Sequence, residues 1–360
     1  MPKKTPLFET FATQGATFRE VGDWVVAETV TTWEDEYQAA QTAAIAADRS
    51  YRGRIRVTGK DHIQFLHNML SNDIKSMQPD AGIHAALLSR KGKLISDLFV
   101  HRRAEDAFLE MEPQRVGPLS EALSRYIVAE DVELEDVSGQ DAIITVAGPL
   151  SPELMSELMG SSFAESPPLQ SKHGQINDLP LTVVSVRQGP GPGFDVYVPA
   201  DRAAGLLQRL SEIDRSGNFR LAGYRTMDTR RIEIGEPRFG VDMDDSHLLL
   251  EAGLLSAVSF SKGCYIGQEY VARLAHRGHL NRKLVGLKLM ETVVPEHDEE
   301  IVGDDRSIGR VTSATLSPAL GCPIALGYVH RDFFDAGTAV TIKNSSGDLG
   351  AVVTDLPFLE

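Results

Sequence analysis

The chain has little cysteine and no long apolar run. Cys264 and Cys322 are its only cysteines among 360 residues, which is too few for a disulfide framework or a four-thiolate metal site. No apolar segment approaches the roughly 18–20 residues that a membrane span needs. The N-terminal "MPKKTPLFETFATQGATF" has no apolar core of signal-peptide length. We therefore expect a cytoplasmic protein that binds no membrane and keeps both thiols reduced.

Basic residues are fewer than acidic ones. The chain has 36 Lys and Arg against 51 Asp and Glu, a formal net charge of −15. An acidic surface repels the phosphate backbone, so we expect no direct binding of nucleic acid. The net charge is still compatible with a local basic channel that binds a small anionic ligand. Hydrophobic residues make up 42% and charged residues 24%, which is typical of a globular chain.

The hydrophobic pattern predicts two successive regions that mix helices and strands, residues 1–140 and 141–281. Predicted helices cover "EDEYQAAQTAAIAAD", "KDHIQFLHNMLSND", "GPLSEALSRYIV", "SPELMSELMG" and "ADRAAGLLQRLSEI". In the fourth of these, Ser151 is the expected N-cap and Gly160 the expected stop. Predicted strands cover "GRIRVTG", "DAFLEME", "DVELEDV", "AIITVAG", "LTVVSVRQ" and "GFDVYVP". Segment 84–103 predicts a hairpin that turns at Lys91-Gly92.

The pattern changes near Arg282. Short apolar segments broken by Gly, Pro, Asp and Ser follow, such as "KLVGLKLM", "PIALGYVH" and "LGAVVTDLP". Helical periodicity is absent from them. Residues 282–360 therefore predict a small antiparallel barrel or sandwich.

Cys264 lies in "SFSKGCYIGQEYVARLAHRGHLNRK", residues 259–283. The stretch predicts a helix that opens at Gly267 and stops at Gly278. The helix dipole and Lys262 would both favour a thiolate at Cys264. The prediction is a partly activated thiol beside an anion pocket. The alternative is a buried cysteine that acts as a small hydrophobic residue.

A metal site at this stretch would lack ligands. His276 and His279 could join Cys264 as ligands, but no second cysteine or carboxylate completes the set. We therefore assign no metal. Cys322 is predicted to be structural.

Two carboxylates interrupt apolar strands. Asp97 lies in "KLISDLFV" and Asp195 in "GFDVYV". A charge at such a position is costly unless it faces a cavity or a partner. Both are candidate site residues, and the alternative for each is an edge or an outward-facing position.

Several motifs together resemble a known family. "KGCYIGQE", followed by "VAR" and "RG", resembles the signature of the YgfZ-type folate-binding proteins, which belong to the superfamily of the glycine cleavage T-protein, an aminomethyltransferase. "VTGKDHIQFLHNMLSNDI", "LLSRKGKLISDLFV", "DTRRIEIGEPRFGVDM" and "GRVTSATLSPALGCPIALGYV" resemble further superfamily segments in the same order. The resemblance covers nearly the whole chain. It implies an α+β fold with two ferredoxin-like domains and a C-terminal antiparallel β-barrel around a central folate channel.

The resemblance also implies roles for individual residues. Asp97 matches a carboxylate near the reactive nitrogens of tetrahydrofolate, and Asp195 matches the carboxylate, usually glutamate, that holds the pterin ring. The other residues that we assign to folate binding are Arg231, Lys262, Tyr265, Gln268 and Arg273. Cys264 and Asp97 are the residues that we expect to be catalytic.

The function implied first is a tetrahydrofolate-binding accessory protein that supports assembly or repair of iron–sulfur enzymes, some of which modify tRNA. Cys264 would be its functional thiol, and iron–sulfur client or assembly proteins its partners. The alternative is a folate-dependent aminomethyltransferase or methyltransferase of the T-protein type. A third reading is a binding module that has lost the folate site. Whether the protein is an enzyme stays open at this point.

Overall fold

The computed structural model describes residues 2–164, 166–176 and 178–359. The chain divides into two compact units, each assembled from separate stretches. The first unit is Met1–Leu66, Ile74–His84 and Leu98–Asp228, and the second is His67–Asp73, Ala85–Asp97 and Thr229–Glu360. The predicted division at residues 140 and 281 stays a prediction. No helix in the described residues is long and apolar enough to cross a membrane.

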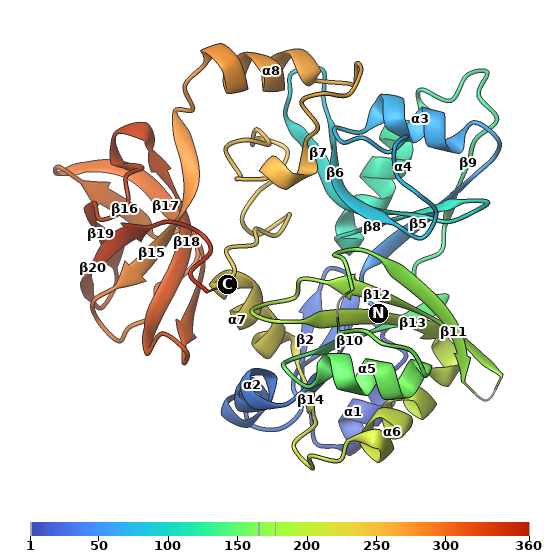
Figure 1. Ribbon diagram of the computed structural model, residues 1–360. Coiled ribbons are helices and arrows are strands. Elements are labelled where there is room, and N and C mark those ends of the chain that lie inside the picture. Colours follow the sequence, from blue (N-terminus) through green and yellow to red (C-terminus); the bar gives the residue numbers. More distant parts are fainter. Residues whose placement is uncertain (1, 165, 177, 360) are drawn as a thin grey trace. The chain divides into compact units, whose positions relative to one another are not determined.

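The fold is the predicted mixed α+β class, with several sheets and a closed antiparallel barrel (Figure 1). Its helices over the described residues are α1 (Phe8–Thr13), α2 (Trp33–Thr42), α3 (His62–Met69), α4 (Val116–Ser124), α5 (Ser151–Met159), α6 (Ala203–Ile213), α7 (Tyr224–Glu233) and α8 (Gln268–Arg277).

The strands of the described residues form four sheets. One has the order β1 (Lys3–Lys4), β3 (Trp24–Thr29), β2 (Thr17–Val21). A second has the order β11 (Ser171–Ile176), β12 (Leu179–Val186), β13 (Gly193–Pro199), β10 (Asp141–Ala147), β4 (Ile45–Asp48), β14 (Arg220–Ala222). A third has the order β6 (Gly82–Leu88), β7 (Leu94–Arg102), β8 (Ala107–Met111), β5 (Gly53–Thr58), β9 (Glu133–Asp136). The barrel has the order β15 (Arg282–Leu289), β18 (Cys322–His330), β17 (Arg306–Ser317), β16 (Glu300–Gly303), β19 (Ala339–Asn344), β20 (Gly347–Thr354).

The predicted helix over residues 34–48 is wrong after Thr42. Helix α2 ends at Thr42, and Ile45–Asp48 is strand β4, which pairs with β10 and β14. Ile45 and Ala46 are fully buried there. Pairing on both sides in a buried sheet thus outweighs the helix propensity of this alanine-rich segment.

The caps of α5 differ from prediction at one end only. The helix stops at Gly160, whose φ of 63° is left-handed as expected. The N-cap is Leu150, so the expected capping role of Ser151 is wrong. The Ser151 hydroxyl donates to the Pro192 carbonyl at 3.3 Å instead.

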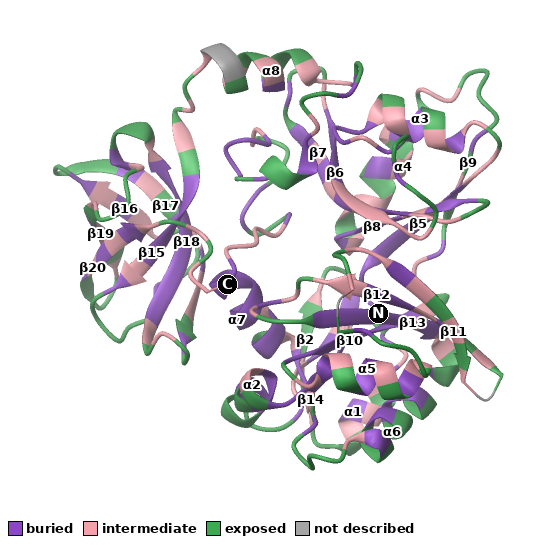
Figure 2. Cartoon of the chain, viewed as in Figure 1, coloured by how far each residue is buried: buried purple, intermediate pink, exposed green. Residues whose placement is uncertain are grey.

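Strand β13 carries apolar side chains on one face of its sheet and polar side chains on the other. Phe194, Val196 and Val198 enter a hydrophobic cluster together with buried residues of α5 and α6. In Figure 2 both helices show a buried and an exposed side. Because strand side chains alternate, Asp195 and Tyr197 are directed to the opposite face of β13. This alternation sets the position of the charged groups described below.

The barrel has its own core within the second unit. Val285, Leu287 and Leu289 of β15 belong to a cluster with apolar residues of the other strands. Figure 1 shows the barrel in orange to red. The predicted C-terminal β structure, which begins near Arg282, is confirmed as a closed barrel.

Candidate functional site

Asp195 belongs to a buried ion-pair cluster in the first unit. Only 2% of the residue is exposed. Arg49 Nη1 donates to Asp195 Oδ2 at 2.8 Å, and the Thr145 hydroxyl donates to Oδ1 at 2.5 Å. The edge or outward position considered for Asp195 is therefore wrong. A buried carboxylate needs such partners, because an isolated one would be strongly penalised by desolvation.

The cluster continues from Arg49 to strand β8. Arg49 Nη2 lies 3.5 Å from Glu110 Oε1, and Arg52 Nε donates to the same oxygen at 3.1 Å. Arg52 Nη1 also donates to Glu112, and the Tyr197 hydroxyl donates to Glu110 Oε2. Two guanidinium groups thus face three carboxyl groups, and all five residues are buried.

The cluster shifts the pKa values of Glu110 and Asp195 in opposite directions. Burial alone would raise the pKa of Glu110, but the charges of Arg52 and Arg49 outweigh it and lower that pKa to about 2. Burial raises the pKa of Asp195, and Arg49 opposes this only in part. Of these two carboxyl groups, Asp195 therefore has the raised pKa and Glu110 the lowered one. Opposite shifts in neighbouring groups are typical of functional sites.

Asp97 lies in the second unit and is half-buried on β7. The next residue of the strand, Leu98, already belongs to the first unit. The predicted hairpin is confirmed around it: Ser89 N donates to the Lys93 carbonyl at 2.8 Å, and Gly92 N donates to the Ser89 carbonyl at 2.9 Å. The catalytic role of Asp97 stays a prediction.

Cys264 is an exposed free thiol in an irregular stretch before α8. The alternative of a buried cysteine is therefore wrong. Helix α8 runs from Gln268 to Arg277, between the predicted Gly267 and Gly278. Gly267 has a left-handed φ of 83°, and a Cβ there would meet the Ser89 carbonyl oxygen at 2.7 Å. Glycine is thus required where the stretch passes the β6–β7 turn.

Lys262 anchors the cysteine stretch through its side chain. Its Nζ donates to the carbonyls of His67, Leu70 and Asn72, the last two at 2.7 and 3.0 Å. These carbonyls lie at and just beyond the C-terminal end of α3, where orphan carbonyls and the helix dipole favour a cation. Burial lowers the pKa of Lys262 to about 8. The hydrogen bonds of this ammonium go to backbone carbonyls, and the charge of Asp73 opposes the lowering of its pKa in part.

We expect Lys262→Met to loosen the cysteine stretch. Three carbonyls lose the hydrogen bond from Lys262, so the second unit should lose about 2–3 kcal/mol of stability. Hydrogen exchange should accelerate in residues 67–72 and 259–268, which mass spectrometry can follow, and the exposed Lys283→Met is the matched control. The folded pKa of Lys262 lies below its ordinary 10.5, so the wild type should gain stability over the variant as pH rises from about 8. Unchanged exchange in both segments would contradict the anchoring role.

The other residues predicted to bind folate from this stretch have different surroundings. Tyr265 is buried in a hydrophobic cluster with Leu88 and Val271, and burial raises its pKa to about 12. Gln268 is half-buried at the first turn of α8. Arg273 is exposed and pairs with Glu269 at 2.6 Å. Their roles toward folate stay predictions.

Arg231 is buried in a polar network of the second unit. Its Nη1 lies 2.5 Å from Asp242 Oδ2, and its Nη2 donates to the Ser313 hydroxyl at 2.7 Å. Asp242 also accepts from the Thr312 hydroxyl at 2.6 Å. These contacts connect α7 to the barrel strand β17, and the folate role predicted for Arg231 stays a prediction.

Two further expectations concern metal and the second cysteine. The described residues contain no group of three or more His, Cys, Asp or Glu side chains that could hold a metal ion. The side chain of His276, proposed as a ligand with His279, lies outside the described part of the structure. Cys322 is partly buried and packs against a cluster that includes Ile324 and Tyr328.

Sequence reasoning missed most of the Asp195 cluster. Glu110 stands in the apolar strand "DAFLEME", which is the same signal that identified Asp97 and Asp195. Applied to every strand, that signal would have found it. Arg49 and Arg52 gave no such signal, because they precede β5 in a stretch without clear periodicity.

Comparison with known proteins places these residues in a family context. Residues 7–262 match the family model described as the GCVT N-terminal domain. Residues 282–360 match the one described as the glycine cleavage T-protein C-terminal barrel domain. Together the two models cover nearly the whole chain.

Similar proteins span the same length. A protein named aminomethyltransferase from Geobacillus kaustophilus is 28% identical, over 99% of this chain and 99% of its own. One of the same name from Caldanaerobacter subterraneus subsp. tengcongensis is 27% identical, over 99% and 96%. The crystal structure of glycine cleavage system aminomethyltransferase T from Bartonella henselae has a TM-score of 0.91 at 21% identity, covering 100% of this chain and 99% of its own. This last likeness shows the shared fold.

Proposed function

Because the chain belongs to the glycine cleavage T-protein family, we propose that it binds tetrahydrofolate and catalyses a folate-dependent aminomethyl transfer. The observation that carries the proposal is the match over 99% of the chain to proteins named aminomethyltransferase. This match favours the aminomethyltransferase function, which was the alternative inferred from the motifs. It does not support the accessory role in iron–sulfur assembly, which the motifs implied first.

Asp195 suits the part of a pterin-binding carboxylate. Its two oxygens accept from Arg49 and Thr145, and each carboxylate oxygen can accept a second hydrogen bond. The N–H and amino edge of a pterin could then be held by a buried carboxylate with strong, charge-assisted bonds. Since aspartate is one methylene shorter than the glutamate usual in the family, we expect the pterin to lie closer to β13.

Asp97 is the proposed proton handler. Tetrahydrofolate supplies the nitrogens that accept the one-carbon unit, and a positioned carboxyl group can move the proton that this exchange requires. Asp97 is half-buried on β7, in the largely apolar segment "LISDLFV", a setting that supports such a task. Arg273 is exposed and basic, so it could meet the anionic glutamyl tail.

A second function has a specific observation in its favour. The stretch "KGCYIGQE" presents an exposed thiol, Cys264, on a segment anchored by Lys262. This thiol would serve the tetrahydrofolate-binding accessory role toward iron–sulfur enzymes, and through them tRNA modification. The curated relatives above carry no such name, so this role rests on the motif alone.

One set of assays separates the two functions. Titration calorimetry with tetrahydrofolate should show binding to the purified chain under either proposal. Turnover of an aminomethylated lipoyl carrier, unchanged in Cys264→Ser, is the result expected for the transferase. No turnover, together with loss of iron–sulfur enzyme activity in cells whose gene copy carries Cys264→Ala, would favour the accessory role. Absence of folate binding would remove both.

A further inference from the structure

A cavity of about 280 Å³ lies within the first unit, over the side of β12 and β13 that carries Thr182 and Tyr197. Phe108, Val184 and Tyr197 give it apolar walls, and His173 lines it with an exposed side chain. The volume is just below the roughly 300–1,000 Å³ of sites for drug-sized ligands. A small apolar group therefore suits this cavity, and no residue assigned above to folate lines it.

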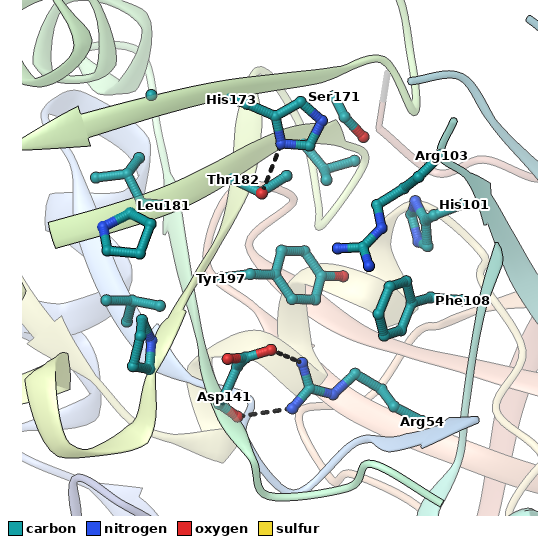
Figure 3. Close-up of a pocket in the computed structure, with 15 residues that line it drawn as sticks. Arg54, His101, Arg103, Phe108, Asp141, Ser171, His173, Leu181, Thr182 and Tyr197 are labelled. Atoms are coloured by element: carbon teal, nitrogen blue, oxygen red, sulfur yellow. Dashed lines mark hydrogen bonds and ion pairs between the residues drawn. The ribbon is translucent and has the colours of Figure 1, made fainter. Parts of the chain in front are cut away.

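The strand register brings a hydroxyl and an imidazole together at this cavity. His173 of β11 stands directly opposite Thr182 of β12, and Thr182 stands opposite Tyr197 of β13. Side chains at opposed positions of neighbouring strands share a face of the sheet, and all three line the cavity. Figure 3 shows the Thr182 hydroxyl directed at the His173 ring, with Thr182 Oγ1 and His173 Nδ1 2.9 Å apart.

A carboxylate on the other side of the ring decides which nitrogen of His173 carries the proton. His173 Nε2 lies 2.9 Å from Asp80 Oδ1. Because a carboxylate only accepts hydrogen bonds, Nε2 must donate, and a neutral imidazole then has Nδ1 free to accept from the Thr182 hydroxyl. The three side chains therefore form a nucleophile, a base and an orienting carboxylate in sequence, as in the triads of hydrolytic enzymes.

The backbone holds Asp80 in place for this task. Its φ of 65° is left-handed, a conformation that Asp and Asn adopt more readily than other non-glycine residues. Its N–H donates to the Arg102 carbonyl at 2.8 Å, and its carbonyl accepts from Ser171 N at 2.7 Å and from Gln170 Nε2 at 3.0 Å. An exposed ion pair adds little to stability, whereas a catalytic base needs an orienting group fixed in this way.

We propose that Thr182, His173 and Asp80 form a second catalytic site, which hydrolyses esters of small apolar acyl groups. In the first step the Thr182 hydroxyl oxygen bonds to the ester carbonyl carbon, and its proton passes to His173 Nδ1. The bond between that carbon and the alcohol oxygen then breaks, and His173 returns the proton to the leaving alcohol. In the second step water attacks the acyl-threonine through the same base, which releases the acid and restores the hydroxyl.

Thr182 and His173 are the catalytic residues of this site, and Asp80 positions the base. The apolar walls of the cavity take the acyl group. The Ser171 hydroxyl lines the cavity two residues before His173, on the same face of β11. It can donate to the carbonyl oxygen as negative charge develops there. The site goes beyond the proposed aminomethyl transfer, because it needs no folate and no residue of the second unit.

Hydrolysis of p-nitrophenyl butyrate by the full chain tests the proposal, since the released nitrophenolate absorbs visible light. Thr182→Val keeps the shape of the side chain but should abolish turnover above the rate in buffer, and Thr182→Ser, which keeps a hydroxyl, should retain it. Asp80→Asn suits the left-handed backbone, but its amide can donate to His173 Nε2 and so favour the proton on Nδ1. It should lower kcat by about 100-fold or more, the range of a lost general base, with little change in KM.

Peptide mapping by mass spectrometry locates the acyl group, which should be on Thr182 in the quenched wild type. Gln175→Ala, exposed on the same strand as His173, is the matched control and should leave the rate unchanged. Three outcomes would overturn the site: no turnover above buffer by a chain whose circular dichroism is native, an unchanged rate in Thr182→Val, or butyrylation of the exposed Cys264 in place of Thr182. If tetrahydrofolate fails to bind but the ester is hydrolysed as expected, the proposed function fails and this site stands.

Discussion

Replacement of Glu36 by alanine should lower the free energy of unfolding of the first unit by about 3–5 kcal/mol, among the largest effects of a single substitution. Glu36 is completely buried on α2. One oxygen accepts from the backbone N–H groups of Val30 and Thr31, at 2.5 and 2.9 Å. The other accepts from Gly223 N at 2.9 Å and from the Thr226 hydroxyl at 2.8 Å. The carboxylate thus joins the entry of α2 to the start of α7.

The large effect follows from the donors left behind. Alanine would leave two buried N–H groups, one partly buried N–H group and a hydroxyl without this acceptor, and each unsatisfied buried group carries a desolvation cost of about 1–3 kcal/mol. Glu36→Gln keeps the size but points an amide NH₂ at donors, so it should also destabilise, by a smaller amount. Glu34→Ala, exposed on the same helix, is the matched control and should change stability by less than about 0.5 kcal/mol.

Urea unfolding followed by tryptophan fluorescence measures this effect directly. The only tryptophans of the chain, Trp24 and Trp33, both belong to the first unit. Their emission therefore reports this unit without a contribution from the barrel. A midpoint for Glu36→Ala within error of the Glu34→Ala midpoint would show that the carboxylate does not support the unit.

Local sequence patterns predicted many of the elements but failed where pairing decides the outcome. Residues 45–48 have a composition that favours a helix, yet they form a central strand because β10 and β14 flank them. The barrel was predictable because short apolar segments and turn residues alternate regularly after Arg282. Its closure was implied only by the family resemblance, since strand order is a property of contacts distant in sequence.

The site residues show the same limit. Asp195 was found because a charge in an apolar strand is visible locally, but its partner Arg49 lies 146 residues away and was not. Glu36 was missed because glutamate is ordinary on a helix that begins with acidic residues. Lys262 was assigned to a thiolate or to folate, and its actual acceptors, carbonyls about 190 residues upstream, could be identified only from the fold.

Asp97→Asn should lower kcat of the proposed aminomethyl transfer by about 100-fold or more, the range typical of a lost proton-transfer group. Asparagine keeps the shape and one acceptor, so the Kd of tetrahydrofolate should change by less than about threefold in calorimetry, in line with a group that acts mainly in the transition state. Asp195→Asn is the contrasting variant: it leaves Arg49 buried with a weaker partner, so it should weaken folate binding and destabilise the first unit. This split between kcat and Kd distinguishes a proton handler from a binding group. If Asp97→Asn turned over at the wild-type rate, proton transfer would have to be assigned to another group.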